Sequence, residues 1–158
     1  MGKYKIEIKW ALIFFVIGLI WIFLERLVGL HDAHIDKHPI YTNFFAIVAI
    51  AVYVFALLDK RKNFYNGKMT WLQGFLAGLI ISVIVAILTP LAQYLTHEVI
   101  TPNYFSNAIQ YAVDSGNTTQ AEAEKYFSLN SYLLQASIGA ILLGVITSAI
   151  VAIFVRKK

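Results

Sequence analysis

The sequence has no cysteine, only three prolines and few charged residues. Without cysteine the chain can form no disulfide, iron–sulfur cluster or cysteine-ligated zinc site, so any metal ion must be bound by histidine, aspartate or glutamate. Charged residues make up 14% of the chain, whereas soluble domains average about 25%. They lie in short groups between long uncharged runs. This pattern excludes a disordered chain and, despite a net charge of +4, a nucleic-acid-binding module.

Hydrophobic residues, in contrast, make up 59% of the chain, against about 45–50% in soluble proteins. A domain of roughly 150 residues still exposes about a third of the surface of its unfolded chain. One small core therefore cannot hold so many apolar side chains, and the excess must face lipid. The composition predicts an integral membrane protein and excludes a soluble enzyme domain.

Four uncharged runs have lengths close to that of a membrane span. A spanning helix needs about 20 residues, and the predicted spans lie at about residues 8–28, 39–58, 69–96 and 132–155. The first follows basic residues, as a signal peptide does, but no small-x-small cleavage site comes after it, so we expect a retained helix. The predicted fold is an all-α integral membrane protein with four transmembrane helices, forming a single membrane domain over residues 1–158.

The distribution of charge predicts how these spans are oriented. Ten of the 13 basic residues fall on the side that holds both termini and the loop 59–68, whereas seven of the nine acidic residues fall on the opposite side. Short loops rich in lysine and arginine stay in the cytoplasm. We therefore expect both termini to be cytoplasmic and residues 25–38 and 97–131 to lie on the outer side.

The outer segment of about residues 100–131 carries helical signals of its own. Pro102 marks a break, residues 114–117 have the composition of a turn, and Thr119 to Glu122 form the capping-box pattern that opens a helix. We expect two short amphipathic helices that rest on the membrane or form a cap over the bundle.

Small residues recur at every fourth position of the third and fourth spans. Such stripes let helix backbones approach closely in lipid, where no hydrophobic force drives helices together. They either pack these two helices against each other within one chain or form a face for a second copy or another membrane protein. The predicted helix-packing residues are Gly74, Gly78 and Ser82 in one span, and Ala136, Ala140, Gly144 and Ser148 in the other.

Glu25 stands at the end of the shortest uncharged run. If Trp10 marks the inner boundary, Glu25 lies only about 22 Å further along the helix, short of about 30 Å of hydrocarbon. A carboxylate held in lipid needs a partner or a water-filled cavity and indicates a functional site. The alternative is an interfacial glutamate paired with Arg26 or a loop lysine. Polar side chains that could complete an outward-facing pocket with Glu25 are Asn43, Thr89, Gln93 and Gln135.

All four histidines fall on the outer side. If residues 31–38 are helical, His31, His34 and His38 share one face and offer three imidazoles to zinc or another transition metal, with His97 as a fourth ligand. The alternative is that these histidines only cap, hydrogen-bond or contact lipid headgroups. The sequence requires no cofactor, and it leaves a transition metal such as zinc open.

Two segments are the most specific in the chain, Asp59-Lys60-Arg61-Lys62-Asn63 and Ile100-Thr101-Pro102-Asn103-Tyr104-Phe105. With shorter segments along nearly the whole chain, they resemble a bacterial membrane family, domain of unknown function 4199, found chiefly in Bacteroidetes. The resemblance implies a small multi-span protein of the bacterial inner membrane. It implies no activity, ligand or functional residue.

The sequence leaves three hypotheses about function. The first is a non-enzymatic membrane subunit that assembles with itself or with a partner, based on the small-residue stripes. The second is a small transporter or a ligand-binding or metal-binding membrane protein with a polar pocket at Glu25. The third is a metal-dependent enzyme that uses the outer histidines, although no nucleophile–base pair is recognisable and no catalytic residue is assigned. The expected partners are the lipid bilayer and a second copy or another membrane protein, and not nucleic acid.

Overall fold

The computed structural model describes residues 2–157, and within them four helices are long and apolar enough to cross a membrane. The four helices are α1 (Lys5–Leu27), α3 (Phe45–Asn63), α4 (Trp71–Tyr94) and α7 (Leu129–Val155). Large apolar side chains stay exposed along their outer faces, as expected for contact with lipid. The predicted fold class, an all-α membrane protein with four transmembrane helices and a helical cap, is confirmed.

Short helical segments extend two of these helices. The segments η1 (Ile35–Lys37), α2 (His38–Tyr41) and η2 (Thr42–Phe44) lead directly into α3, and the π-helix η3 (Leu95–Ile100) continues α4. Counted with these segments, the second and third spans contain 29 and 30 residues. π-Helical turns are rare and frequently occur at functional sites.

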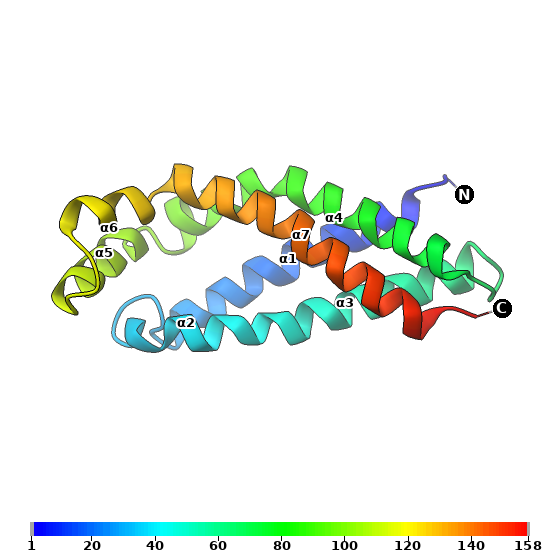
Figure 1. Cartoon of the computed structure of the whole chain (residues 1–158), viewed down its shortest axis with the longest axis horizontal. Coiled ribbons are helices and arrows are strands. Elements are labelled where there is room, and N and C mark those ends of the chain that lie inside the picture. The colour runs from blue at the N-terminus through cyan, green and yellow to red at the C-terminus, as the bar shows by residue number, and fades with distance from the viewer. Residues whose placement is uncertain (1, 158) are drawn as a thin grey trace.

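The helices run along the long axis of the molecule, and the two ends of the bundle differ (Figure 1). Both ends of the chain lie at one end, here named the terminal end. At the other, named the cap end, lie α2 and the two cap helices α5 (Tyr104–Asp114) and α6 (Gln120–Tyr126). The backbones of Met69 and Lys157 exchange two hydrogen bonds at the terminal end, which ties the loop before α4 to the end of α7. Lys158, which the sequence places on this side, lies outside the described residues.

Capping boxes determine where α4 and α6 begin. In α6 the Thr119 hydroxyl accepts from the Glu122 backbone N–H, and the Glu122 carboxylate accepts from the Thr119 backbone N–H. Thr70 and Gln73 make the same reciprocal pair at the start of α4. These bonds satisfy backbone donors that a helix start leaves free. The capping box predicted at Thr119 is confirmed.

The small-residue stripes of α4 and α7 face each other within one chain. A methyl group added at Gly78 would overlap the side chain of Ser148, and one added at Gly144 would overlap that of Ser82. Gly74 likewise lies against Ala152. The structure thus shows the first alternative for these positions, packing within one chain, and a homo-oligomer or a membrane partner stays a prediction. Ala136 and Ala140 lie nearer the cap end of α7 and are partly buried.

A buried ion pair joins α1 to α3 at the terminal end. Lys60 Nζ lies 2.8 Å from Glu7 Oε1, and both side chains are almost fully buried. The same ammonium donates to the Lys3 carbonyl and lies over the ring of Phe64. The sequence assigned Glu7 and Lys60 to the inner side and did not predict their pairing, because this contact depends on how α1 and α3 pack.

Candidate functional site

At the cap end of α1 the chain reverses direction around Gly29. This residue has a φ of +79°, a left-handed conformation that favours glycine. The Leu30 N–H donates to the Glu25 carbonyl and the Gly29 N–H donates to the Arg26 carbonyl, which together form a Schellman motif. The motif ends the helix and turns the following residues back over its last turn. His31 is thereby brought to Glu25.

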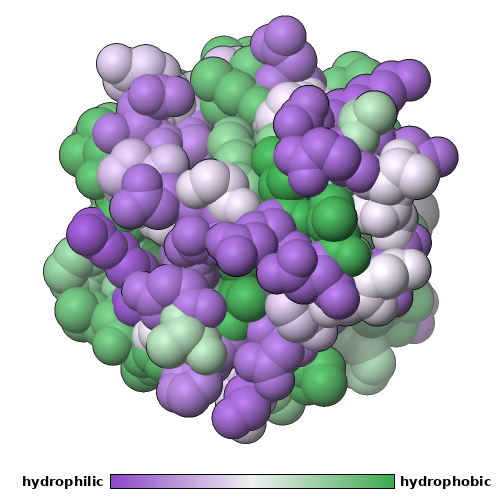
Figure 2. All heavy atoms as spheres, turned by 90° about the vertical axis from the view of Figure 1, so that its left-hand side faces the viewer, coloured by the Kyte–Doolittle hydropathy of each residue, from purple (hydrophilic) through white to green (hydrophobic). Residues whose placement is uncertain are grey.

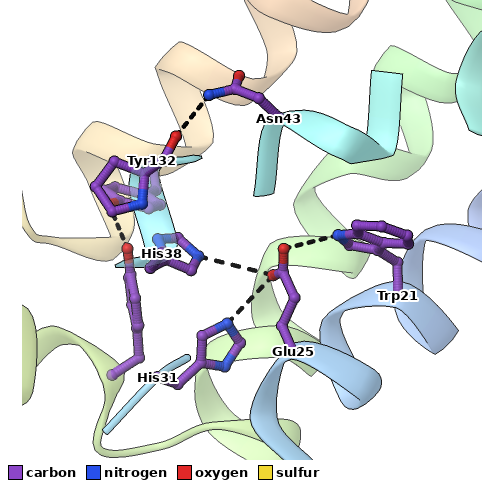
Figure 3. Close-up of polar contacts among 8 residues, drawn as sticks. Trp21, Glu25, His31, His38, Asn43 and Tyr132 are labelled. Carbon is purple, nitrogen blue, oxygen red and sulfur yellow. Dashed lines mark hydrogen bonds and ion pairs between the residues drawn. The ribbon is translucent and has the colours of Figure 1, made fainter. Parts of the chain in front are cut away.

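Glu25, His31 and His38 converge at this turn (Figure 3). The Nε2 atoms of His31 and His38 lie 3.3 Å and 3.7 Å from Glu25 Oε2. One donor atom from each of the three residues lies within 4.8 Å of the others. Glu25 and His31 are buried, and His38 is mostly buried. We call these three residues the Glu–His cluster.

Trp21 holds the other oxygen of the Glu25 carboxylate. Its indole Nε1 donates a 2.7 Å hydrogen bond to Glu25 Oε1. The two residues are four apart on α1, the spacing at which side chains of a helix meet. This bond leaves Oε2 directed at the two imidazoles (Figure 3), so the carboxylate presents one oxygen to the cluster.

The cluster can pair through hydrogen bonds or hold a metal ion. The 3.3 Å contact of His31 with Glu25 is a long hydrogen bond, and the 3.7 Å contact of His38 is longer than a hydrogen bond. Two ligands at about 2.0–2.1 Å from a tetrahedral ion lie about 3.3–3.4 Å apart. Two imidazoles and one carboxylate are also a ligand set that zinc and iron(II) accept with coordination positions left open.

Aromatic rings enclose the cluster. The ring of Tyr104, at the start of α5, lies 5.2 Å from that of His31 and 5.3 Å from that of His38, measured between centroids. Its hydroxyl is 3.2 Å from the hydroxyl of Tyr132 on α7. Asn107 of α5 donates to the His31 carbonyl and fastens the loop to the cap. The cap helix α5 therefore helps to place both histidines.

Tyr104 is buried beside the charged cluster. Burial raises the pKa of the Tyr104 hydroxyl above its ordinary value; the hydrogen bond with Tyr132 opposes this, and the negative charge of Glu25 adds to it. The hydroxyl therefore stays protonated and can donate a hydrogen bond at neutral pH.

A cavity of about 550 Å³ adjoins the cluster at the cap end. Figure 2 shows this end of the molecule, with polar side chains over most of it and apolar surface between them. His38 and Tyr104 line the cavity on the side of the cluster, and α5 and α6 supply much of the remaining wall. One imidazole thus belongs to both the cluster and the cavity.

The other two predicted histidine ligands lie elsewhere. Residues 28–34 form turns and not a helix, so His31, His34 and His38 do not share a helical face. His34 is exposed. His97 is buried in η3, where its Nε2 lies 3.1 Å from Gln93 Oε1 and its ring stacks on that of Phe105. The structure thus brings together two of the four histidines, with Glu25 as the third member.

The predicted polar pocket does not form as one group of residues. Asn43 donates to the Pro39 carbonyl, Thr89 donates to the Val85 carbonyl, and Gln135 donates to Ser131. Gln93 pairs with His97. Each of these side chains has a hydrogen-bond partner four residues away along its own segment, and within residues 2–157 none of the four is hydrogen-bonded to Glu25.

Two contributors were not singled out from the sequence. Trp21 carries a usable signal, because an indole N–H four residues before an intramembrane carboxylate is in reach of it. Tyr104 carries none, since its contact with the histidines depends on how the cap folds over the bundle. Within residues 2–157 the buried Nδ1 of His31 has no hydrogen-bond partner, so this imidazole is oriented by its Nε2 contact with Glu25 and by packing against Tyr104.

Comparison with known proteins gives a family and no activity. A family model described as "Protein of unknown function (DUF4199)" matches residues 9–157. A search of curated proteins found no match, and neither did a search of solved structures.

Proposed function

We propose that this chain, which belongs to the DUF4199 family of proteins of unknown function, is a membrane protein that binds a divalent transition metal ion at the cap end. Glu25, His31 and His38 are the ligands. The observation that carries this proposal is that three donor atoms, from residues up to 13 positions apart in the chain, lie within 4.8 Å of one another in a buried site.

The surroundings of the cluster support a cation. A buried carboxylate and two imidazoles cost free energy unless they are paired or coordinate a metal. Trp21 orients the carboxylate from behind, as residues around metal ligands commonly do. With three protein ligands, a tetrahedral ion keeps one position for water or another molecule. A site of this kind can bind or sense a ligand, or activate it.

In this proposal the metal site lies on the outer side of a bacterial inner membrane. Lysine and arginine concentrate at the end that holds both termini, which favours a cytoplasmic location for that end. The cap and the cluster then face the periplasm. Reporter fusions at the C-terminus and in the cap test this orientation, which predicts a cytoplasmic terminus and a periplasmic cap.

Metal content tests the proposed site. The protein is purified in detergent without chelator, incubated with zinc, desalted and analysed by mass spectrometry for metal. We expect about one zinc per chain, since the three ligands form one site, and loss of the metal in Glu25→Gln and in His38→Ala.

His34→Ala is the matched control, because this exposed histidine lies in the same loop and outside the cluster. We expect the His34→Ala variant to bind as much zinc as the wild type. Wild-type protein without zinc, or equal loss of zinc in His34→Ala and His38→Ala, contradicts the proposal.

A further inference from the structure

We propose that the cavity beside the Glu–His cluster binds a single-chain amphiphile with an anionic oxygen headgroup, such as a long-chain carboxylic acid. The headgroup lies toward His38 and Tyr104, and the chain lies between α5 and α6. The position of the headgroup in this proposal rests on the proposed metal-binding function, whereas the position of the apolar chain rests on the cavity alone.

The wall of the cavity suits an apolar chain. Alanines at buried positions of both cap helices leave the space, and aromatic rings border it. A volume of about 550 Å³ falls within the roughly 300–1,000 Å³ of small-molecule sites, and the proposal assigns this space to one chain. The apolar wall residues that carry this argument are Ala108, Ala112, Ala123, Tyr111, Tyr126 and Phe127.

Charged groups on the cavity wall orient the proposed ligand. A divalent ion held by one carboxylate and two neutral imidazoles leaves a net positive charge beside His38. Glu122 also lines the cavity, and hydrogen bonds from Thr119 and Thr118 lower its pKa, so that it is an anion at neutral pH. An anionic headgroup is therefore attracted to the cluster and repelled from Glu122.

The groups around His38 can receive an oxygen headgroup. A metal ion held by the cluster would keep an open coordination position, and His38 and Tyr104 line the cavity beside it. A neutral alkane has no oxygen atom that could bind a metal ion. The site therefore selects amphiphiles over plain hydrocarbon, and a carboxylate over a cationic headgroup.

Photolabelling tests the proposal on the full chain. Zinc-loaded protein in detergent is irradiated with a diazirine-bearing stearic acid, and the labelled peptides are mapped by mass spectrometry. We expect label on residues 104–127 that unlabelled stearate removes by competition and that phosphatidylglycerol does not. Removal of zinc by a chelator should lower this labelling by about fivefold or more, in the range typical of coupled binding sites.

Two alanine variants separate the cavity from the cap surface. Ala112→Phe places a ring in the cavity and should abolish the competed label while the zinc content stays unchanged, which also shows that the variant is folded. Ala121→Phe adds the same ring on the exposed face of α6 and should label like the wild type. If Ala112→Phe does not fold, Ala108→Leu fills the same wall with a smaller side chain.

The outcomes separate the two proposals. Label that stearate does not displace, or that persists in a folded Ala112→Phe variant, overturns the cavity site. Equal competition by phosphatidylglycerol overturns the single-chain ligand. Competed cap labelling in a protein that binds no zinc overturns the metal-binding function and the headgroup contact with it, while the chain site stands.

Discussion

Glu7 and Glu25 lie on the same face of α1 at its opposite ends. They are 18 residues apart, which is five turns at 3.6 residues per turn, and both are buried. Glu7 is neutralised by the ammonium of Lys60, whereas Glu25 faces two imidazoles. The partner of Glu7 is a lysine of the same chain, which does not bind metal ions. The partners of Glu25 are imidazoles, which can bind a metal ion. The same helix thus carries a structural carboxylate at one end and a candidate ligand at the other.

The buried Glu7–Lys60 pair should dominate stability at the terminal end. Glu7→Gln leaves the ammonium buried without its counter-charge, which costs about 3–5 kcal/mol. The double variant Glu7→Leu with Lys60→Met should recover much of this, because an apolar pair of similar volume removes both charges. Unfolding in sodium dodecyl sulfate, followed by circular dichroism, measures the difference.

The neighbouring pair of Lys9 and Asp59 is the control for that measurement. The Lys9 side chain is half exposed, so Lys9→Met should cost less than about 1 kcal/mol. A Glu7→Gln variant that is no less stable than Lys9→Met would show that the buried pair is energetically unimportant.

Gly78→Ala should destabilise the monomer and leave its oligomeric state unchanged. The added methyl group meets Ser148 of the same chain, and overpacking of this kind costs about 1–3 kcal/mol. Gly139→Ala is the matched control on α7, because no atom lies within 4 Å of the added group. Detergent unfolding gives the stability, and light scattering gives the size. A shift in oligomer size with Gly78→Ala would instead place the stripe at an interface between copies.

Zinc should stabilise the wild-type protein, since a ligand that binds only the folded state adds free energy of unfolding. At about 100 times the dissociation constant the gain is about 2.7 kcal/mol. A chelator should reverse it, and acid should weaken it, because imidazole and carboxylate ligands must be deprotonated to bind metal. Thermal unfolding with and without zinc measures the gain, which His31→Ala should lose and His34→Ala should keep. Equal stabilisation of both variants would assign the effect to zinc bound elsewhere.

Tyr104 should make the protein sensitive to alkali. Its pKa is raised in the folded state by burial, so above about pH 10, where an unfolded tyrosine ionises, the unfolded state gains stability that the folded state does not. The contribution is fully present below that pH and is lost as the pH rises through the folded-state value. Tyr104→Phe should therefore show a smaller loss of stability between neutral pH and about pH 11.

Unfolding in denaturant across this pH range is the measurement for Tyr104. Tyr111→Phe is the matched control in the same helix, because Tyr111 is exposed. A Tyr104→Phe variant with the same alkaline slope as the wild type would refute the expectation.

Much of the fold could be predicted from the sequence, because the signals are local. The length of each uncharged run predicts a span, and a capping box predicts where α6 begins. The helices themselves need no partner to satisfy their backbone. Because the number of spans is even, both ends of the chain lie at the same end of the bundle (Figure 1).

The composition of the site depends on tertiary structure. The sequence identified Glu25 and the histidines as separate candidates and joined Glu25 to Gln93 and Gln135, which bond within their own helices. The hydrophobic runs predict that helices exist, and they carry no information on the rotation of one helix against another or on the path of a loop. The turn at Gly29 and the docking of α5 determine which side chains meet.

The sequence by itself determined a four-span membrane protein with its basic residues concentrated on one side and its acidic residues on the other, because hydropathy and charge act residue by residue along the chain. Only the tertiary structure decided that Glu25 meets His31 and His38, and that Glu7 is buried against Lys60. Those contacts join segments whose relative rotation is set by side-chain packing between helices and by one left-handed glycine, neither of which a linear pattern of apolar residues encodes.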